Sequence, residues 1–202
     1  KEAENWFLTG EKWFCSIPDA DLAMVLARPK DNPLGTKGLS LFLLPKILQN
    51  GSHNSYEIIR LKDKLGGKSF ASGEIKLNKA FAYLIGDPNQ GFKQMTDMIN
   101  MSRLSNGVRA SGIMQRSIQE SIYISQNRNA FDKKLLDLPL MQKQILKMLL
   151  LTEASRSMVF KTAKILEKAD NGKKEFEKLF RVLTPLIKFR ACRDARKVSG
   201  DA

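Results

Sequence analysis

The first eighty-five or so residues carry short apolar runs with the length and spacing that are typical of β-strands. Turn-forming segments separate them, among them Thr9-Gly10-Glu11 and Pro18-Asp19. The last two runs alternate polar and apolar side chains, as strands with one buried face do. The predicted strands cover residues 6–8, 12–16, 22–27, 39–44, 56–61 and 73–77. We therefore expect an antiparallel sheet or a small barrel in this part of the chain.

The period of the apolar positions changes after residues 86–91 (GDPNQG), from about two residues to about 3.6. This change predicts long helices in the remainder of the chain. They are expected over residues 91–128, from Pro139 to a break at 170–172, and from about residue 176 onward. Pro139 suits the first turn of its helix, whereas Pro185 should kink or interrupt the third.

Small residues fill the middle of the first predicted helix. Gly107, Ala110 and Gly112 lie there within residues 105–112. Because a glycine costs about 1 kcal/mol in a helix interior, close packing of another backbone or a bound ligand should compensate. A tight contact is therefore expected at this point.

Strands followed by long helices predict the α+β class, in which an antiparallel sheet or barrel segment precedes an antiparallel bundle of long helices. The expected domains are residues 1–88 and 89–202. The chain has no initiator Met and stops at Gly200-Asp201-Ala202 without a polar tail, so we expect an excised segment.

Composition limits the choice of function only weakly. The formal charge of +13 suits an anionic ligand or nucleic acid, but the basic residues are scattered, and a solvated helix surface explains them equally well. Cys15 and Cys192 match no metal-ligand spacing and are interpreted as reduced packing residues, and His53 lies in a polar turn without partner ligands. With no apolar run long enough for a membrane span, a cytoplasmic protein without bound metal is predicted.

The ordered motifs carry a more specific signal than any one of them alone. They are residues 6–16 (WFLTGEKWFCS), 64–69 (KLGGKS), 72–75 (SGEI), 85–92 (IGDPNQGF), 102–103 (SR) and 128–131 (RNAF). In this order the chain resembles the acyl-CoA dehydrogenase superfamily over almost its whole length. Residues 60–66 (RLKDKLG) and 138–141 (LPLM) more narrowly resemble the branch named for the adaptive response to DNA alkylation.

The resemblance implies an FAD-dependent α,β-dehydrogenation of an acyl-CoA thioester, in which a base removes the α-proton and a hydride leaves for flavin N5. It assigns residues 1–88 to the end of the middle β-domain and residues 89–202 to a truncated C-terminal helical domain. It also implies a homodimer or homotetramer that passes electrons to an electron-transfer flavoprotein.

By position in the motifs, Phe14 would lie against the isoalloxazine, and the hydroxyl and backbone N–H of Ser16 would contact the flavin near N5. The alternative is that Trp13, Phe14 and Ser16 are ordinary strand residues, one facing the core and one facing water. Arg128 and Phe131 would contact the pyrophosphate and adenine end of an FAD held mainly by a neighbouring subunit, although Asp132 replaces the glycine of the family motif. An arginine at a helix end is the simpler alternative for Arg128.

Arg103 matches an arginine that the family keeps close to the catalytic carboxylate, so it is a candidate support for the base; a surface ion pair is its alternative. No acidic residue of this sequence matches the catalytic glutamate, which in the family follows the matched segment. The fragment is therefore expected to be inactive and to bind FAD weakly or not at all. Two rival functions remain, a binding protein that holds DNA on its basic surface and a helical interaction module without a ligand.

Overall fold

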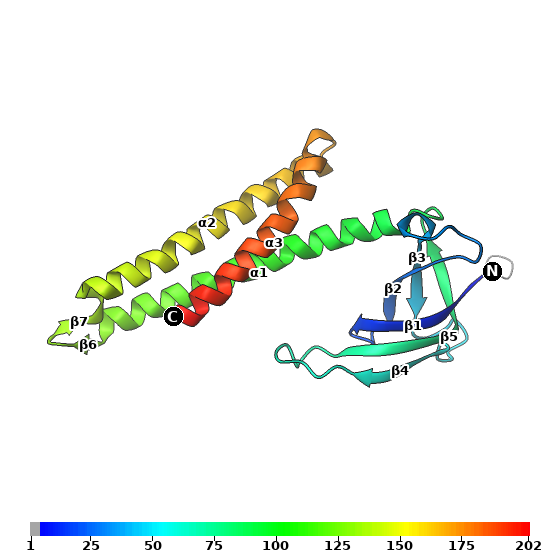
Figure 1. The fold of residues 1–202 in the computed structure, drawn as a ribbon, viewed down its shortest axis with the longest axis horizontal. Helices are drawn as coiled ribbons and strands as arrows, with labels where there is room; N and C mark the ends of the chain where they lie inside the picture. The colour runs from blue at the N-terminus through cyan, green and yellow to red at the C-terminus, as the bar shows by residue number, and fades with distance from the viewer. Residues whose placement is uncertain (1–4) are drawn as a thin grey trace. The chain divides into compact units, whose positions relative to one another are not determined.

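Five antiparallel strands form one sheet in the first part of the chain. The computed structural model describes residues 5–202 (Figure 1). Its internal contacts divide the chain into two units, Lys1–Thr96 and Asp97–Ala202. The strands are β1 (Trp6–Ser16), β2 (Leu22–Ala27), β3 (Ser40–Pro45), β4 (Tyr56–Leu61) and β5 (Ser72–Ile85). Their path runs β1-β5-β3-β2, and β4 pairs with the other edge of β5 near its start. The long strand β5 therefore connects the whole sheet.

The sheet unit has an apolar core because alternate side chains of its strands point to one face. Phe42, Ile75 and Leu77 are almost completely buried there, and the Trp6 ring packs against Phe42 at a centroid distance of 5.2 Å. The sequence divided residues 6–16 into two strands at Gly10, but they form a single strand. Gly10, at φ 141°, lets the strand continue through a register shift.

Three long helices follow: α1 (Gly91–Asn127), α2 (Pro139–Asp170) and α3 (Glu175–Asp201). Pro139 begins α2 as predicted, where its missing N–H costs nothing. Pro185 lies inside α3, and the helix is not interrupted there, so the predicted break is absent. The predicted α+β class, a sheet followed by long helices, is confirmed.

The start of α1 is fixed by close packing against β3. The backbone N–H of Gly91 donates to the carbonyl of Leu39 at 3.0 Å, and the N–H of Asn89 donates to Ser40 Oγ at 3.0 Å. A Cβ atom on Gly91 would lie 2.3 Å from the carbonyl carbon of Ser40, a distance that real Cβ atoms do not adopt. Only glycine can occupy this position without moving the backbone.

The helical unit buries two apolar clusters between its three helices, a large one and a smaller one formed by Leu104, Ile165 and Phe180. Met114 and Ile118 of α1, Met148 of α2, and Ile187 and Val198 of α3 are almost inaccessible to solvent. A Cβ atom on Gly107 would lie 2.4 Å from Cγ2 of Ile187, whereas one on Gly112 would meet nothing within 4 Å. A close contact therefore exists at Gly107, where the side chain of Ile187 packs on the backbone of α1, but not at Gly112.

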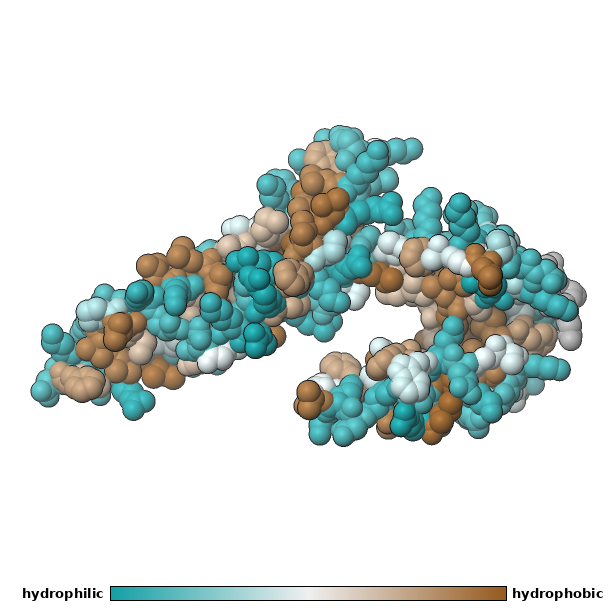
Figure 2. All heavy atoms as spheres, viewed as in Figure 1, coloured by the Kyte–Doolittle hydropathy of each residue, from teal (hydrophilic) through white to brown (hydrophobic). Residues whose placement is uncertain are grey.

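Many apolar side chains of the helical unit remain on its surface. Figure 2 shows brown, apolar side chains on the helices among teal, polar ones. The most exposed large ones on α2 and α3 are Leu140, Leu146, Leu150, Phe160, Val182, Leu186 and Phe189. Within residues 5–202, no helix combines the length and apolarity that a bilayer span requires.

Candidate functional site

The end of β1 bulges at the two aromatic residues Trp13 and Phe14. Lys12 pairs with Ile75 of β5 and Cys15 pairs with Gly73, so two residues of β1 lie opposite Glu74 alone. On the other side of β5 the register of β4 also shifts, between Ile58 and Arg60. A β-bulge, in which one strand has an extra residue, changes the direction of the neighbouring side chains. Glu74 therefore lies at a point where both neighbouring strands are irregular.

Two cations hold the Glu74 carboxylate. Arg60 donates from Nε to Oε1 at 2.8 Å, and Lys62 Nζ donates a short hydrogen bond to the same oxygen. Glu74 is buried, and so is most of the Lys62 side chain, whereas that of Arg60 is 61% exposed. The hydrogen bond from Lys62 is the main cause that holds the pKa of Glu74 below its ordinary value, and it outweighs the opposing effect of burial. The carboxylate therefore stays ionised.

The same lysine reaches the aromatic bulge. Lys62 Nζ lies 3.4 Å from the ring centroid of Trp13 and 4.6 Å from that of Phe14. A cation at such distances is attracted by the negative face of an aromatic ring. Lys62 thus connects the bulge of β1 to Glu74 of β5.

Phe14 and Ser16 both reach the surface. Phe14 is 71% exposed and Ser16 is exposed, in keeping with two residues of a strand that are two positions apart and share a face. After Ser16 the chain turns at Ile17, which has φ 55° and whose N–H donates to the carbonyl of Ala71 at 2.8 Å. The ordinary-strand alternative expected one of Trp13, Phe14 and Ser16 to face the core, but Trp13 is also 63% exposed, so none of the three does.

The other predicted pair lies in a hairpin that follows α1. The short strands β6 (Asn129–Ala130) and β7 (Lys133–Lys134) pair, and the N–H of Leu135 donates to the carbonyl of Arg128 at 2.9 Å. Phe131 and Asp132 make the turn at φ 53° and 59°, the signs of a type I′ turn. The turn leaves Phe131 86% exposed and Arg128 exposed.

Arg103 lies half-buried on α1 and, within the part of the chain that the structure describes, makes no carboxylate contact that would identify a surface ion pair. Its Nη1 donates to Asn100 Oδ1 at 3.0 Å, and that oxygen also accepts from Thr184 Oγ1 of α3 at 3.2 Å. Arg103 lines an open hollow of about 580 Å³ together with Lys188 and Arg193. The hollow is therefore strongly basic.

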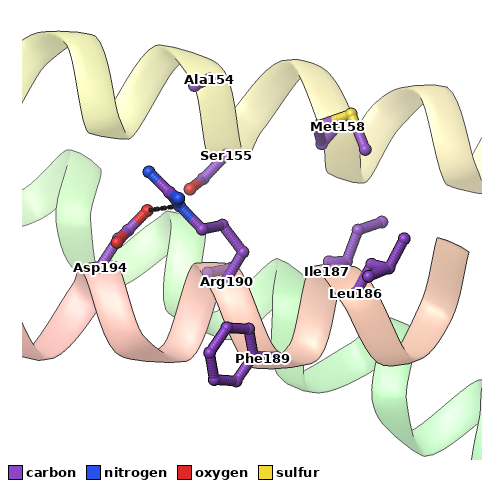
Figure 3. A pocket seen from close by; sticks show the side chains of 9 residues that line it. Ala154, Ser155, Met158, Leu186, Ile187, Phe189, Arg190 and Asp194 are labelled. Carbon is purple, nitrogen blue, oxygen red and sulfur yellow. Dashed lines mark hydrogen bonds and ion pairs between the residues drawn. The ribbon is translucent and has the colours of Figure 1, made fainter.

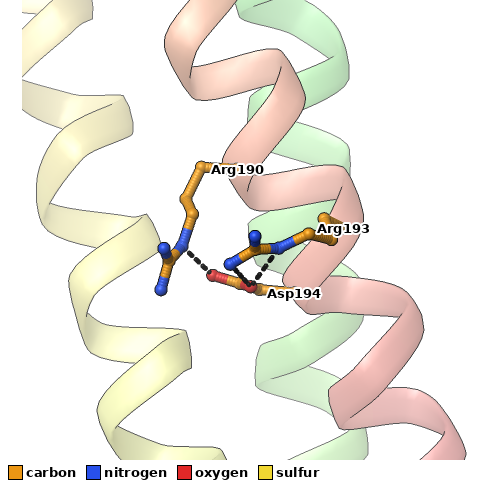
Figure 4. Close-up of polar contacts among 3 residues, drawn as sticks. All are labelled: Arg190, Arg193 and Asp194. Atoms are coloured by element: carbon orange, nitrogen blue, oxygen red, sulfur yellow. Dashed lines mark hydrogen bonds and ion pairs between the residues drawn. The ribbon is translucent and has the colours of Figure 1, made fainter.

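A buried acid of the helical unit was not expected from the sequence. Asp194 of α3 is 4% exposed and accepts from Arg190 Nε at 2.6 Å and from Arg193 at 3.4 Å (Figure 4). Figure 3 shows the Arg190–Asp194 pair beside a hollow of about 380 Å³ between α2 and α3. Its other lining residues are mostly apolar, such as Met158, Leu186 and Phe189. Asp194 has two cationic partners, so a structural role accounts for it.

The predicted residues therefore fall into two groups. Phe14 and Ser16 lie in the unit Lys1–Thr96, whereas Arg103, Arg128 and Phe131 lie in the unit Asp97–Ala202.

Within residues 5–202 no three His, Cys, Asp or Glu side chains come together as a metal site would require. Both cysteines are free thiols; Cys15 is half-buried, but Cys192 is exposed, so its interpretation as a packing residue is wrong.

Comparison with known proteins finds similarity to acyl-CoA dehydrogenases over almost the whole chain. The family described as acyl-CoA dehydrogenase, C-terminal domain, matches residues 89–202. Acyl-CoA dehydrogenase family member 11 of Caenorhabditis elegans is 35% identical over 200 residues, which are 96% of this chain and 32% of that protein. The putative acyl-CoA dehydrogenase AidB of Escherichia coli is 32% identical over 193 residues, 95% of this chain and 34% of that protein.

A solved structure resembles the chain equally well. The crystal structure of Caenorhabditis elegans ACDH-11 in complex with C11-CoA superposes with a TM-score of 0.88 at 34% identity, over 98% of this chain and 34% of that one. The chain spans about a third of the length of these relatives.

Proposed function

The chain belongs to the acyl-CoA dehydrogenase family, and from this membership we propose that it is part of an FAD-dependent dehydrogenase that converts an acyl-CoA thioester to its 2,3-enoyl form. When bound, FAD would supply the acceptor for the hydride that leaves the acyl β-carbon. The observation that carries the proposal is the joint exposure of Phe14 and Ser16 at the bulged end of β1.

The exposed end of β1 fits a flavin. A flat aromatic side chain, Phe14, is free to stack on one face of a ring system, and Ser16 can donate from its hydroxyl to a ring nitrogen. A donor in that place stabilises negative charge as the ring is reduced. Phe14 would therefore orient the flavin, and the Ser16 hydroxyl would donate a hydrogen bond to it.

The hairpin after α1 fits the other end of the dinucleotide. Arg128 offers a planar guanidinium for paired phosphate oxygens, and Phe131 offers an exposed ring for adenine. We propose that these two residues hold the pyrophosphate and adenine of an FAD bound mainly by a neighbouring subunit. This arrangement requires a homodimer or homotetramer, for which the exposed apolar surfaces of α2 and α3 provide contact area.

Among residues 5–202 we find no general base beside Phe14. Glu74, which lies opposite the bulge, is bound by Lys62 and Arg60, and its lowered pKa makes it a poor proton acceptor. Arg103 carries a charge suited to keeping a carboxylate ionised, and we propose that it supports a base outside this chain. The 202-residue chain alone should then be inactive.

Further properties of the whole protein are part of the same proposal. ACDH-11 is seen with C11-CoA, and by similarity we propose an acyl-CoA substrate here. We also propose an electron-transfer flavoprotein as the electron acceptor and the cytoplasm as the location of the protein.

The test of this function is anaerobic titration of the flavin-loaded parent protein with acyl-CoA thioesters of increasing chain length. Oxidation of the thioester should bleach the visible flavin absorption, and the enoyl product should appear in equal amount. A parent protein that purifies with flavin but is bleached by none of the thioesters would contradict dehydrogenase activity.

A basic groove supports DNA binding as a second candidate function. Two hollows share Cys192, one lined by Arg103, Lys188 and Arg193, and the other, of about 390 Å³, by Arg109 and Arg196. No Asp or Glu lines either hollow among the described residues. Phosphate-driven binding would use these cations and would fall steeply with salt.

This second function is tested by measuring DNA affinity at several salt concentrations. Replacing Arg109 and Arg196 by Met should weaken binding and reduce the salt slope by about one or two units. Exposed Lys161 and Lys178, replaced together by Met, are the matched control for charge. Equal losses for the two double variants would favour nonspecific attraction to the +13 chain over a groove.

A further inference from the structure

Lys62 occupies an unusual place in the sheet unit. It follows the last residue of β4, and its backbone N–H continues the strand ladder by donating to the carbonyl of Ser72 at 2.6 Å. Its side chain then extends across β5 to the bulge of β1 and is only 12% exposed. A lysine side chain is normally solvated, so burial of this kind requires partners for the ammonium.

The ammonium has partners of two kinds. The Glu74 carboxylate accepts a short hydrogen bond from it, and the rings of Trp13 and Phe14 lie 3.4 Å and 4.6 Å from it. Arg60, two residues before Lys62 in the chain, donates to the same oxygen of Glu74 at 2.8 Å and helps to fix the position of the carboxylate. The Lys62 ammonium is therefore held between the Glu74 carboxylate and the rings of Trp13 and Phe14.

Trp13 has one further cationic neighbour, since the guanidinium carbon of Arg60 lies 5.5 Å from its ring centroid, whereas Lys62 is the cation that lies over both rings. The side chains of Trp13 and Phe14 are 63% and 71% exposed, and both residues lie opposite one residue of β5 instead of two. An exposed aromatic side chain on an irregular strand samples several rotamers unless a neighbour selects one. Lys62 contacts both rings at once, which favours a single arrangement of the bulge.

We propose that Lys62, held by Glu74, is a positioning residue for the flavin: it fixes the Trp13–Phe14 bulge so that Phe14 and Ser16 are presented to the isoalloxazine together. The inference rests on the proposed function, since it concerns the same site. Lys62 acts through Phe14 and does not need to touch the flavin itself. Preorganisation of this kind raises affinity by lowering the ordering cost of binding.

The experiment is an NMR titration of the 15N-labelled 202-residue chain with riboflavin, and in parallel with riboflavin 5′-phosphate. The variants are Lys62→Met, which keeps the aliphatic stem, Lys62→Arg, which keeps the charge, and Glu74→Gln, which releases Lys62 without removing it. Lys68→Met removes one exposed charge of the neighbouring loop and serves as control. Chemical shifts of the core residues around Ile75 establish that each variant is folded.

The backbone signals of residues 13–16 should shift with riboflavin and approach saturation only at high ligand concentration, because this chain alone is expected to bind flavin weakly. The dissociation constant should rise by about fivefold or more in Lys62→Met and in Glu74→Gln, the change expected for loss of a partly desolvated cation–π contact. It should stay within about twofold of the unaltered chain in Lys62→Arg and Lys68→Met.

The outcomes that overturn the inference differ from those that overturn the function. Equal riboflavin affinities for Lys62→Met and the unaltered chain would remove the positioning role and leave the flavin site in place. A loss seen with riboflavin 5′-phosphate but not with riboflavin would mean that Lys62 only attracts phosphate, which also overturns positioning. If riboflavin shifts no signal of residues 13–16 in the unaltered chain, the flavin site fails and the inference fails with it.

Discussion

Gly91 lies against the backbone of Ser40 so closely that a methyl group on it would be 2.3 Å from the Ser40 carbonyl carbon. The contact joins the first turn of α1 to β3, and neither backbone can yield without losing hydrogen bonds such as that from Gly91 N–H to Leu39. We therefore predict that Gly91→Ala lowers the free energy of unfolding by about 1–3 kcal/mol, the cost of overpacking. Urea denaturation measures this change.

Gly112→Ala is the matched control, because it lies in the same helix and a Cβ atom there meets nothing within 4 Å. Alanine should stabilise α1 at that position by up to about 1 kcal/mol. Losses of similar size in both variants would show that the cost at Gly91 does not come from contact with β3.

The buried Asp194 depends on Arg190 more than on Arg193. The bond from Arg190 Nε is 2.6 Å long, and that from Arg193 is 3.4 Å. Arg190→Met should lower the free energy of unfolding by about 1–2 kcal/mol, less than for a fully buried pair because the arginine is 60% exposed. Arg193→Met should cost under about 0.5 kcal/mol. Thermal unfolding of both variants tests this order, and a larger loss for Arg193→Met would contradict it.

Glu74 makes the sheet unit sensitive to acid. Its pKa in the folded chain is lowered, chiefly by the hydrogen bond from Lys62, so its contribution to stability is complete above the unfolded-state pKa of about 4.3. The contribution is lost as the pH falls through the lower, folded-state pKa. The stability difference between the unaltered chain and Glu74→Gln should therefore be constant above about pH 5 and shrink below it. Urea denaturation from pH 3 to pH 7 measures it, and a difference that grows on acidification would contradict the assigned direction.

The hairpin after α1 contains a strained turn that glycine would relieve. Asp132 has φ 59°, and the family motif that residues 128–131 resemble continues with glycine at this position. Asp132→Gly should stabilise the chain by about 0.5–1 kcal/mol, seen as a higher melting temperature. Asp137, which is not among the residues with positive φ, is the control: Asp137→Gly should be neutral or destabilising.

Strands and helices followed from the sequence where apolar periodicity was regular. Residues 22–27 and the three helices agree with the structure within a few residues. Strand β5 was predicted only over residues 73–77, because Asn78 and Lys79 end the apolar alternation there, yet the strand continues to Ile85 with Lys79 at φ 53°. The hairpin at 129–134 was missed since Phe131 and Asp132 are not the residues that a type I′ turn favours.

The surroundings of the candidate site were less accessible to sequence reasoning. Motif positions singled out Phe14 and Ser16, but Glu74 occupies a polar position of an alternating strand and should by that pattern face water. It is buried because Arg60 and Lys62 cover it, a contact that depends on register shifts in both neighbouring strands. Single-sequence patterns do not reveal where a bulge falls. The cluster of Lys62, Glu74 and Trp13 could only be found in three dimensions.

The most direct test of the account is to locate a bound flavin by intermolecular NOEs in the 202-residue chain with excess riboflavin 5′-phosphate. The account predicts NOEs from the isoalloxazine protons to the Phe14 ring and to the β-protons of Ser16. NOEs confined to other residues, or none at concentrations that saturate the shifts, would contradict the assignment of this surface to the flavin.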